Sequence, residues 1–91
     1  MDKVNLNLFG DMIWARRLKL GINGKDLISR LGVTISSTYL RLIEEKGAIP
    51  RADLVKRLAL VLGLDVKELF DVVIAIKLLR YEIVLREKYK D

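Results

Sequence analysis

Several residue types that carry much of protein chemistry are scarce or absent in this chain of 91 residues, which has no cysteine, no histidine and a single proline. Without cysteine, neither a disulfide framework nor a thiolate metal site can form, and without histidine the commonest metal ligand and general base is missing. The adjacent carboxylates Glu44 and Glu45 have no partners at metal-ligand spacing, and no serine has a partner base. We therefore expect no metal, no cofactor and no enzymatic activity.

Long apolar runs are also missing. Met1–Phe9 lacks the apolar stretch of a signal peptide, and the most apolar tract, Val72–Leu79, is broken by Lys77 and followed by Arg80. We therefore expect a soluble, cytoplasmic protein with no membrane partner. The apolar content of 52% is enough for one domain with a core. So short a chain folds with a narrow margin, which dimerisation would widen.

The net charge of +5 is compatible with a polyanionic partner but does not identify one. Residues 1–50 carry 8 basic and 5 acidic side chains, and residues 51–91 carry 9 and 7, so the charge is spread evenly along the chain. Charge alone is therefore a weak argument for nucleic acid.

Apolar spacing predicts two short helices joined by a tight turn between residues 21 and 50. Leu27, Ile28 and Leu31 keep helical spacing up to Gly32, and Leu40 and Ile43 resume it after a polar cluster. Two such helices form a helix-turn-helix unit. We prefer a second helix at Ser37–Lys46 capped by Ser36, and a longer one capped by Thr34 is the alternative.

Three further helices are expected. The first covers Asp11–Leu20, with Phe9, Ile13 and Leu20 as its core positions, and the fourth covers Ala52–Leu62. No glycine or proline interrupts Val66–Asp91, so a last helix of 26 residues, about 39 Å long, is permitted. Its β-branched residues at 72–76 leave a strand as a minor alternative.

A set of residues with a distinctive joint spacing runs through the segment Phe9–Phe70, which is 62 of the 91 residues. They are Phe9-Gly10, Ile13, Arg17, Gly21-Ile22-Asn23, Leu27, Leu31-Gly32-Val33, Ser36, Tyr39-Leu40, Ile43-Glu44, Pro50, Leu54, Leu58-Ala59, Leu62-Gly63 and Glu68-Leu69-Phe70. With these residues the segment resembles the phage-repressor and Cro type of helix-turn-helix domain, also called the xenobiotic-response-element family. Their joint spacing carries the resemblance. It implies an all-α, five-helix, lambda-repressor-like domain whose third helix reads DNA, usually as a dimer.

Helix periodicity and the family register together predict the DNA-binding residues. If Leu40 and Ile43 face the core, the outer face of the third helix presents small hydroxyls for close entry into the groove, and Arg41 for a bidentate contact to guanine. Phosphate contacts are expected around the groove by family position. The expected DNA-binding residues are Asn23, Lys25, Ser36, Ser37, Thr38, Tyr39, Arg41, Leu42 and Lys46.

One ion pair and two departures from the family pattern stand out. Arg17 and Glu44 resemble the family's structural pair between the first and third helices, and Arg16 could compete for Glu44. The family normally has leucine where Arg16 stands, and often a phosphate- or base-binding glutamine where Gly24 stands. Trp14 and Leu18 add apolar surface on a second face of the first helix.

The C-terminal helix carries two apolar stripes, which is more than one face needs. We expect one to cover its own domain, against Trp14 and Leu18, and the other to meet a second subunit. A helix folded entirely onto its own core is the alternative. The stripe assigned to the dimer interface is Leu69, Val72, Ile76, Leu79 and Ile83; the neighbouring one is Ile74, Leu78, Tyr81 and Leu85.

These observations favour a prokaryotic or phage regulator of transcription that binds double-stranded DNA as a homodimer. Residues 1–70 would form the DNA-binding domain, and residues 71–91 a helical extension for dimerisation. The alternative is a protein-interaction module, an antitoxin or an assembly subunit, whose C-terminal helix captures another protein.

Overall fold

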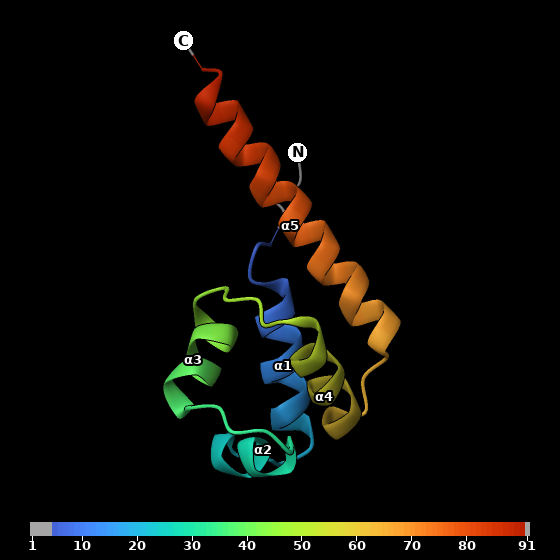
Figure 1. The fold of residues 1–91 in the computed structure, drawn as a ribbon. Helices are drawn as coiled ribbons and strands as arrows, with labels where there is room; N and C mark the ends of the chain where they lie inside the picture. The colour runs from blue at the N-terminus through green and yellow to red at the C-terminus, as the bar shows by residue number, and fades with distance from the viewer. Residues whose placement is uncertain (1–4, 91) are drawn as a thin grey trace.

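The computed structural model describes residues 5–90, and within them every regular element is a helix (Figure 1). The five helices are α1 (Leu8–Lys19), α2 (Gly24–Arg30), α3 (Ser37–Glu45), α4 (Ala52–Leu62) and α5 (Val66–Lys88). The prediction of an all-α chain is confirmed, and the strand considered for residues 72–76 is wrong, because they lie inside α5. None of the described helices is long and apolar enough to cross a bilayer.

Side-chain caps determine where three of the helices begin. Asn23 accepts a hydrogen bond from the Asp26 amide at the start of α2, and Asp65 caps α5 through the amides of Lys67 and Glu68. Ser36 accepts from the Tyr39 amide, which confirms the shorter of the two starts considered for α3. Helix α5 ends at Lys88 rather than at the expected Asp91, which itself lies outside the described residues.

The first helix differs from its predicted bounds at its start and in its core. It begins at Leu8, three residues before Asp11, so Phe9 and Gly10 lie within it and are buried. Leu20, predicted to be a core residue, is 43% exposed. The left-handed turn at Gly21 follows directly (φ 69°), and it is Ile22 that enters the core instead.

The close approach of α1 to α3 depends on Gly10. A Cβ at this position would collide with the backbone carbonyl oxygen of Ile43 and lie 2.9 Å from that of Glu44. Only glycine therefore allows the two backbones to pack so closely here. By contrast, a Cβ on Gly24 would make an ordinary contact of 3.5 Å with a Leu40 methyl group.

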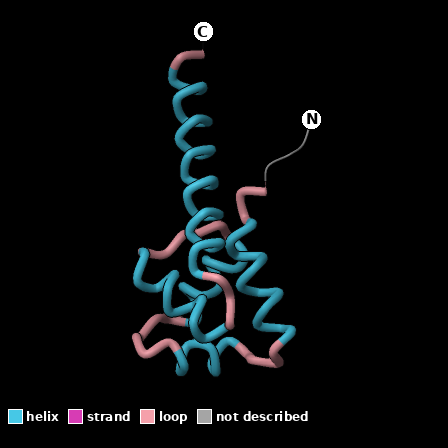
Figure 2. Tube along the Cα trace, turned by 90° about the vertical axis from the view of Figure 1, so that its right-hand side faces the viewer, coloured by secondary structure: helices cyan, strands magenta, loops and turns pink. Residues whose placement is uncertain are grey.

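Helices α1–α4 surround the core, and α5 packs against α1 and α4 and continues beyond them (Figures 1 and 2). The buried apolar side chains come from all five helices and from Ile22 and Leu31 beside them. They are Phe9, Ile13, Ile22, Leu27, Leu31, Leu40, Ile43, Leu54, Val55, Leu58, Ala59, Leu62, Leu69, Val73 and Ile76.

The stripe predicted for a dimer interface faces the chain's own core over its first half. Leu69 is fully buried and Ile76 is 2% exposed, so neither is available to a second subunit, and their assignment to a dimer interface is corrected. Val72 and Leu79 are half-buried, and Ile83 is 43% exposed. The inward-facing line is instead Leu69, Val73, Ile76 and Arg80.

The surface of α1 that carries Trp14 and Leu18 remains open. These side chains are 48% and 53% exposed, so they are not the surface that α5 covers, and that expectation is wrong. Neighbouring positions explain this result, because α1 turns Arg16 toward the end of α4 and Arg17 toward α3. The indole and the leucine then point to solvent beyond these contacts.

Candidate nucleic-acid interface

Helix α3 separates its residues into a buried and an exposed side. Leu40, Ile43 and Glu44 face inward and are at most 7% exposed. The opposite side is open to solvent, because a helix turns 100° per residue and these positions point away from the three buried ones. Its exposed residues are Ser37, Thr38, Arg41, Leu42 and Glu45. The exposed side thus combines hydroxyls at its start, a cation in its middle and an anion at its end.

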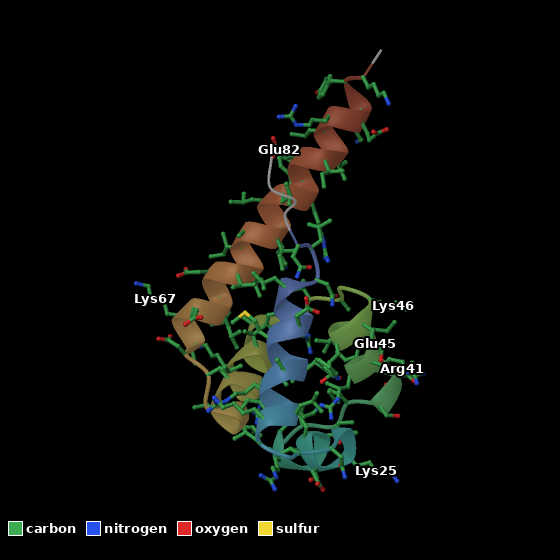
Figure 3. The ribbon with its side chains drawn as sticks, turned by 180° about the vertical axis from the view of Figure 1, so that it is seen from behind. Lys25, Arg41, Glu45, Lys46, Lys67 and Glu82 are labelled. Atoms are coloured by element: carbon green, nitrogen blue, oxygen red, sulfur yellow. The ribbon has the colours of Figure 1, made fainter. Side chains whose placement is uncertain are left out.

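The N-terminus of α2 lies beside this exposed side of α3. Asn23, Gly24 and Lys25 share a shallow groove of about 330 Å³ with Ser37 and Arg41. Lys25, Arg41 and Lys46 lie on the same side of the molecule in Figure 3, whereas Lys67 and Glu82 on α5 lie away from it. The fold therefore brings residues from two helices together on one surface.

Two of the predicted contact residues have a second role, and two lie toward the edges of this surface. The side-chain oxygens of Asn23 and Ser36 each accept a backbone hydrogen bond of 2.9 Å, which leaves the Asn23 amide NH₂ and the Ser36 hydroxyl proton for another acceptor. Tyr39 is half-buried and lines a different hollow with Arg51. Lys46 lies at the far end of α3.

The structure brings Arg17 of α1 and Glu44 of α3 into a two-bond ion pair. Arg17 Nε donates to Glu44 Oε2 and Arg17 Nη2 donates to Glu44 Oε1, each at a distance of 2.9 Å. Arg17 Nη1 donates to the Ile22 carbonyl at 3.2 Å. The side chains are 14% and 5% exposed. The hydrogen bond and the charge of Glu44 raise the pKa of Arg17 above its ordinary value, against the opposing effect of burial. The guanidinium is therefore charged at any pH used to study folding.

Arg16 does not compete for Glu44, because it has a partner of its own. Its Nε donates to the Leu62 carbonyl at the end of α4 over 2.7 Å. The last carbonyls of a helix lack intrahelical donors, and a cation is favoured beside them. Arg16 thereby ties α1 to α4.

Two more arginines donate hydrogen bonds to carbonyls at the C-terminal ends of α2 and α3. Arg57 Nη1 donates to the Leu31 carbonyl over 3.0 Å, and Arg80 Nη2 donates to the Gly47 carbonyl and to that of Leu6. The partners are 26 to 74 residues apart in sequence, so no local pattern could have revealed them. Part of the hydrogen-bonding capacity of these arginines therefore serves the fold.

One acidic residue lies within the exposed surface of α3. Glu45 Oε2 is 3.6 Å from Arg41 Nε, in an i,i+4 pair whose side chains are 59% and 73% exposed. An exposed pair of this kind contributes little to stability, so Arg41 can leave it readily. Glu45 also weakens the positive potential that Lys25, Arg41 and Lys46 create.

Comparisons with protein-family models, with curated proteins and with solved structures gave no match to this chain. The interpretation of this surface therefore depends on its own residues and geometry.

Proposed function

We propose that this protein is a sequence-specific regulator of transcription that binds double-stranded DNA as a homodimer, with α2 and α3 forming a helix-turn-helix of the phage-repressor and Cro type. The observation that carries the proposal is the exposed side of α3, which presents Ser37, Thr38 and Arg41 together beside the N-terminus of α2. A helix exposed in this way, with small hydroxyls at its start, suits entry into the major groove.

In this mechanism α3 reads bases and α2 holds the backbone. Arg41 leaves Glu45 and makes two hydrogen bonds to guanine O6 and N7, and Leu42 contacts a thymine methyl group. Lys25 and Lys46, at opposite ends of the surface, contact phosphates and set the register of α3. Occupancy of the operator by the dimer then obstructs or recruits the transcription machinery.

Fluorescence anisotropy with random duplex DNA at low salt tests the proposal, because even a reader without its operator binds there through phosphates. We expect the protein to bind this DNA. In Lys25→Ala the slope of log affinity against log salt concentration should decrease by about one, the value for one lost phosphate contact. Lys67→Ala is the matched control, since it removes the same charge from α5, away from the candidate surface. Equal losses from the two variants, or no binding at all, would reject this surface.

Base reading needs a separate test. Selection from a random duplex pool should return a two-fold motif. Arg41→Ala should then weaken binding to the selected site by about 1–3 kcal/mol and relax one base position. Equal losses on selected and random DNA would remove Arg41 from base recognition.

Two substitutions should increase affinity. Glu45→Gln removes an anion that faces the phosphates, and Gly24→Gln adds the side chain that the resembling family often has at that position. The Gly24 backbone is helical and a Cβ there meets only a leucine methyl group at 3.5 Å, so the backbone accepts a side chain at this position. Unchanged affinity in both variants would count against DNA at this surface.

A protein-interaction module is the second candidate function, favoured by the exposed Trp14 and Leu18 on α1. An indole and a leucine one turn apart, both about half exposed, are typical of a protein contact. Failure to bind random duplex DNA at low salt, together with a folded protein, would favour this reading.

A further inference from the structure

Helix α5 has a second apolar line that the body of the molecule leaves open. Ile74, Leu78 and Tyr81 are 54%, 64% and 64% exposed, and the half-buried Leu85 continues them. We call these four residues the outer line. Their spacing of four, three and four residues places them along one side of the helix, roughly 130° around it from the core-facing Val73.

The outer line ends in opposite charges. Asp71 lies three residues before Ile74, and Lys88 lies three residues after Leu85, so both continue the same heptad spacing. Both are exposed. Neither takes part in an ion pair among residues 5–90. From its N-terminal to its C-terminal end, this side of α5 therefore carries an acidic residue, the four large apolar residues of the outer line and a basic residue.

We propose that the outer line is the homodimer surface, and that two α5 helices pack on it antiparallel about a two-fold axis between Leu78 and Tyr81. In this register Ile74 lies opposite Leu85 of the partner subunit, and Leu78 lies opposite Tyr81 of the partner subunit. Asp71 then faces Lys88 of the partner subunit at both ends of the contact. The inference deepens the homodimer part of the proposed function and rests on it, but it does not depend on DNA.

A second copy of the chain is the occupant that this pattern fits. A helix that carries an acid, an apolar line and a base in that order is complementary to itself when reversed, because every position then meets a favourable partner. The contact would span 18 residues, about 27 Å of helix, with no glycine or proline to interrupt it.

The end charges favour the antiparallel over the parallel arrangement. In a parallel pair Asp71 would face its own copy, and so would Lys88, so each end of the line would carry two like charges. A parallel pair would gain contacts between Lys77 and Glu82 of the partner subunit. That gain is small, since both residues flank the line in solvent and Glu82 already bonds Arg86 over 2.8 Å.

Cysteine cross-linking can distinguish the two arrangements, and the chain's lack of cysteine removes any background. We expect Ile74→Cys mixed with Leu85→Cys to give an oxidised heterodimer, while each variant alone gives little. The two copies of residue 74 would be roughly 16 Å apart along an antiparallel pair, too far for a disulfide. Strong self-linking of each single variant would overturn the proposal in favour of parallel helices.

Charge exchange tests the ends of the line independently. Asp71→Lys alone, and Lys88→Asp alone, should each weaken the dimer roughly tenfold, because two favourable pairs become repulsive. The double variant Asp71→Lys with Lys88→Asp should restore most of the loss. Sedimentation equilibrium measures the dissociation constants, and circular dichroism checks that each variant keeps its helices. A double variant no tighter than either single one would overturn the register.

The same proteins separate this inference from the proposed function. A wild-type chain that stays monomeric at hundreds of micromolar, yet binds random duplex DNA, would overturn the outer line as a dimer surface and leave DNA binding intact. A dimer with the expected cross-links that binds no DNA would support the outer line and reject the proposed function.

Discussion

The two halves of α5 differ sharply in what their apolar residues contact. In the half from Val66 to Arg80, Leu69 and Ile76 are almost completely buried against the other helices. In the half from Tyr81 to Lys88, which extends beyond the body in Figure 1, every residue except the half-buried Leu85 is exposed. The first half has 8 leucine, isoleucine or valine residues and 5 charged ones among 15, and the second has 3 and 4 among 8, so the second half is richer in charge but still carries large apolar residues.

Tertiary contacts account for the difference. Isolated helices shorter than about 12–15 residues are marginal in water, and most helical stability in proteins comes from packing of one face of the helix. The first half has that packing, and Arg80 fastens its end to the Gly47 carbonyl. Among the described residues, the second half is supported by helix propagation, by the half-buried Leu85 and by the exposed ion pair between Glu82 and Arg86. A partner would therefore contribute most there.

Replacing Ile76 or Ile83, which lie seven residues apart on α5, with aspartate should give the largest difference in unfolding free energy between the two halves. Ile76→Asp places a carboxylate in the core, where Ile76 is 2% exposed, and should cost about 5 kcal/mol or more, which is enough to unfold the domain. Ile83→Asp, at 43% exposure, should cost less than about 1 kcal/mol. Denaturant unfolding followed by circular dichroism measures both.

The outcome for Ile83→Asp also tests the outer line. Ile83 lies on the opposite side of α5 from it, so this variant should dimerise as the wild type does. Equal destabilisation by the two aspartates would mean that the projecting half is packed as tightly as the first.

Apolar spacing was sufficient to predict the five helices and much of the core, because buried residues recur every three or four positions within one helix, as Leu40 and Ile43 do in α3 and Leu54 and Leu58 do in α4. It could not say which stripe of α5 faces inward. The inward line includes Arg80, which a search for apolar residues passes over, and it omits Val72 and Leu79. Contacts with residues far away in the chain decide that choice.

The second prediction compares an ion pair between packed helices with one in the projecting half of α5, residues 81–88. Glu44→Ala leaves the Arg17 guanidinium without its partner in a site where the two side chains are 14% and 5% exposed, and should cost about 3–4 kcal/mol. Glu82→Ala removes the exposed pair with Arg86, at 51% and 77%, and should cost about 0.3–0.5 kcal/mol. Denaturant midpoints at constant slope give both values.

A third glutamate controls for helix propensity in this comparison. Glu45→Ala follows Glu44 directly on α3 but removes only an exposed pair, so its midpoint should stay near that of the wild type. If Glu44→Ala behaved like Glu45→Ala, the ion pair would have no part in holding α1 against α3.

The candidate interface was partly accessible from sequence for a similar reason. Ser36 and Asn23 are recognisable as caps because capping acts within three residues. The arginines that bind helix ends were not recognisable, since Arg16 reaches Leu62 and Arg57 reaches Leu31 only in the folded chain. Sequence therefore could not show which arginines bind helix ends.

Arg80 marks the boundary between the two halves, and its loss should have an intermediate effect. Arg80→Met keeps the aliphatic stem but removes the hydrogen bonds to the Gly47 and Leu6 carbonyls, and should cost about 1–2 kcal/mol. Arg86→Met, in the projecting half, is the control and should cost under about 0.5 kcal/mol. Thermal unfolding compares them, and equal melting temperatures would show that Arg80 does not fasten α5.

Removing the projecting half altogether should have the smallest effect on the fold and a complete effect on association. A chain that ends at Arg80 keeps Leu69, Val73 and Ile76, and it loses residues that make few contacts with the body. Its unfolding free energy as a monomer should fall by less than about 1 kcal/mol, because mainly helix propagation is removed. It also loses Tyr81 and Leu85 of the outer line, so it should sediment as a monomer at every concentration tested.

A chain that ends at Val73 is the control for truncation: it lacks Ile76 and Arg80, opens the core, and should fail to fold. If the chain ending at Arg80 were equally unfolded, the projecting half would belong to the core of the domain, and the difference between the two halves of α5 would not exist.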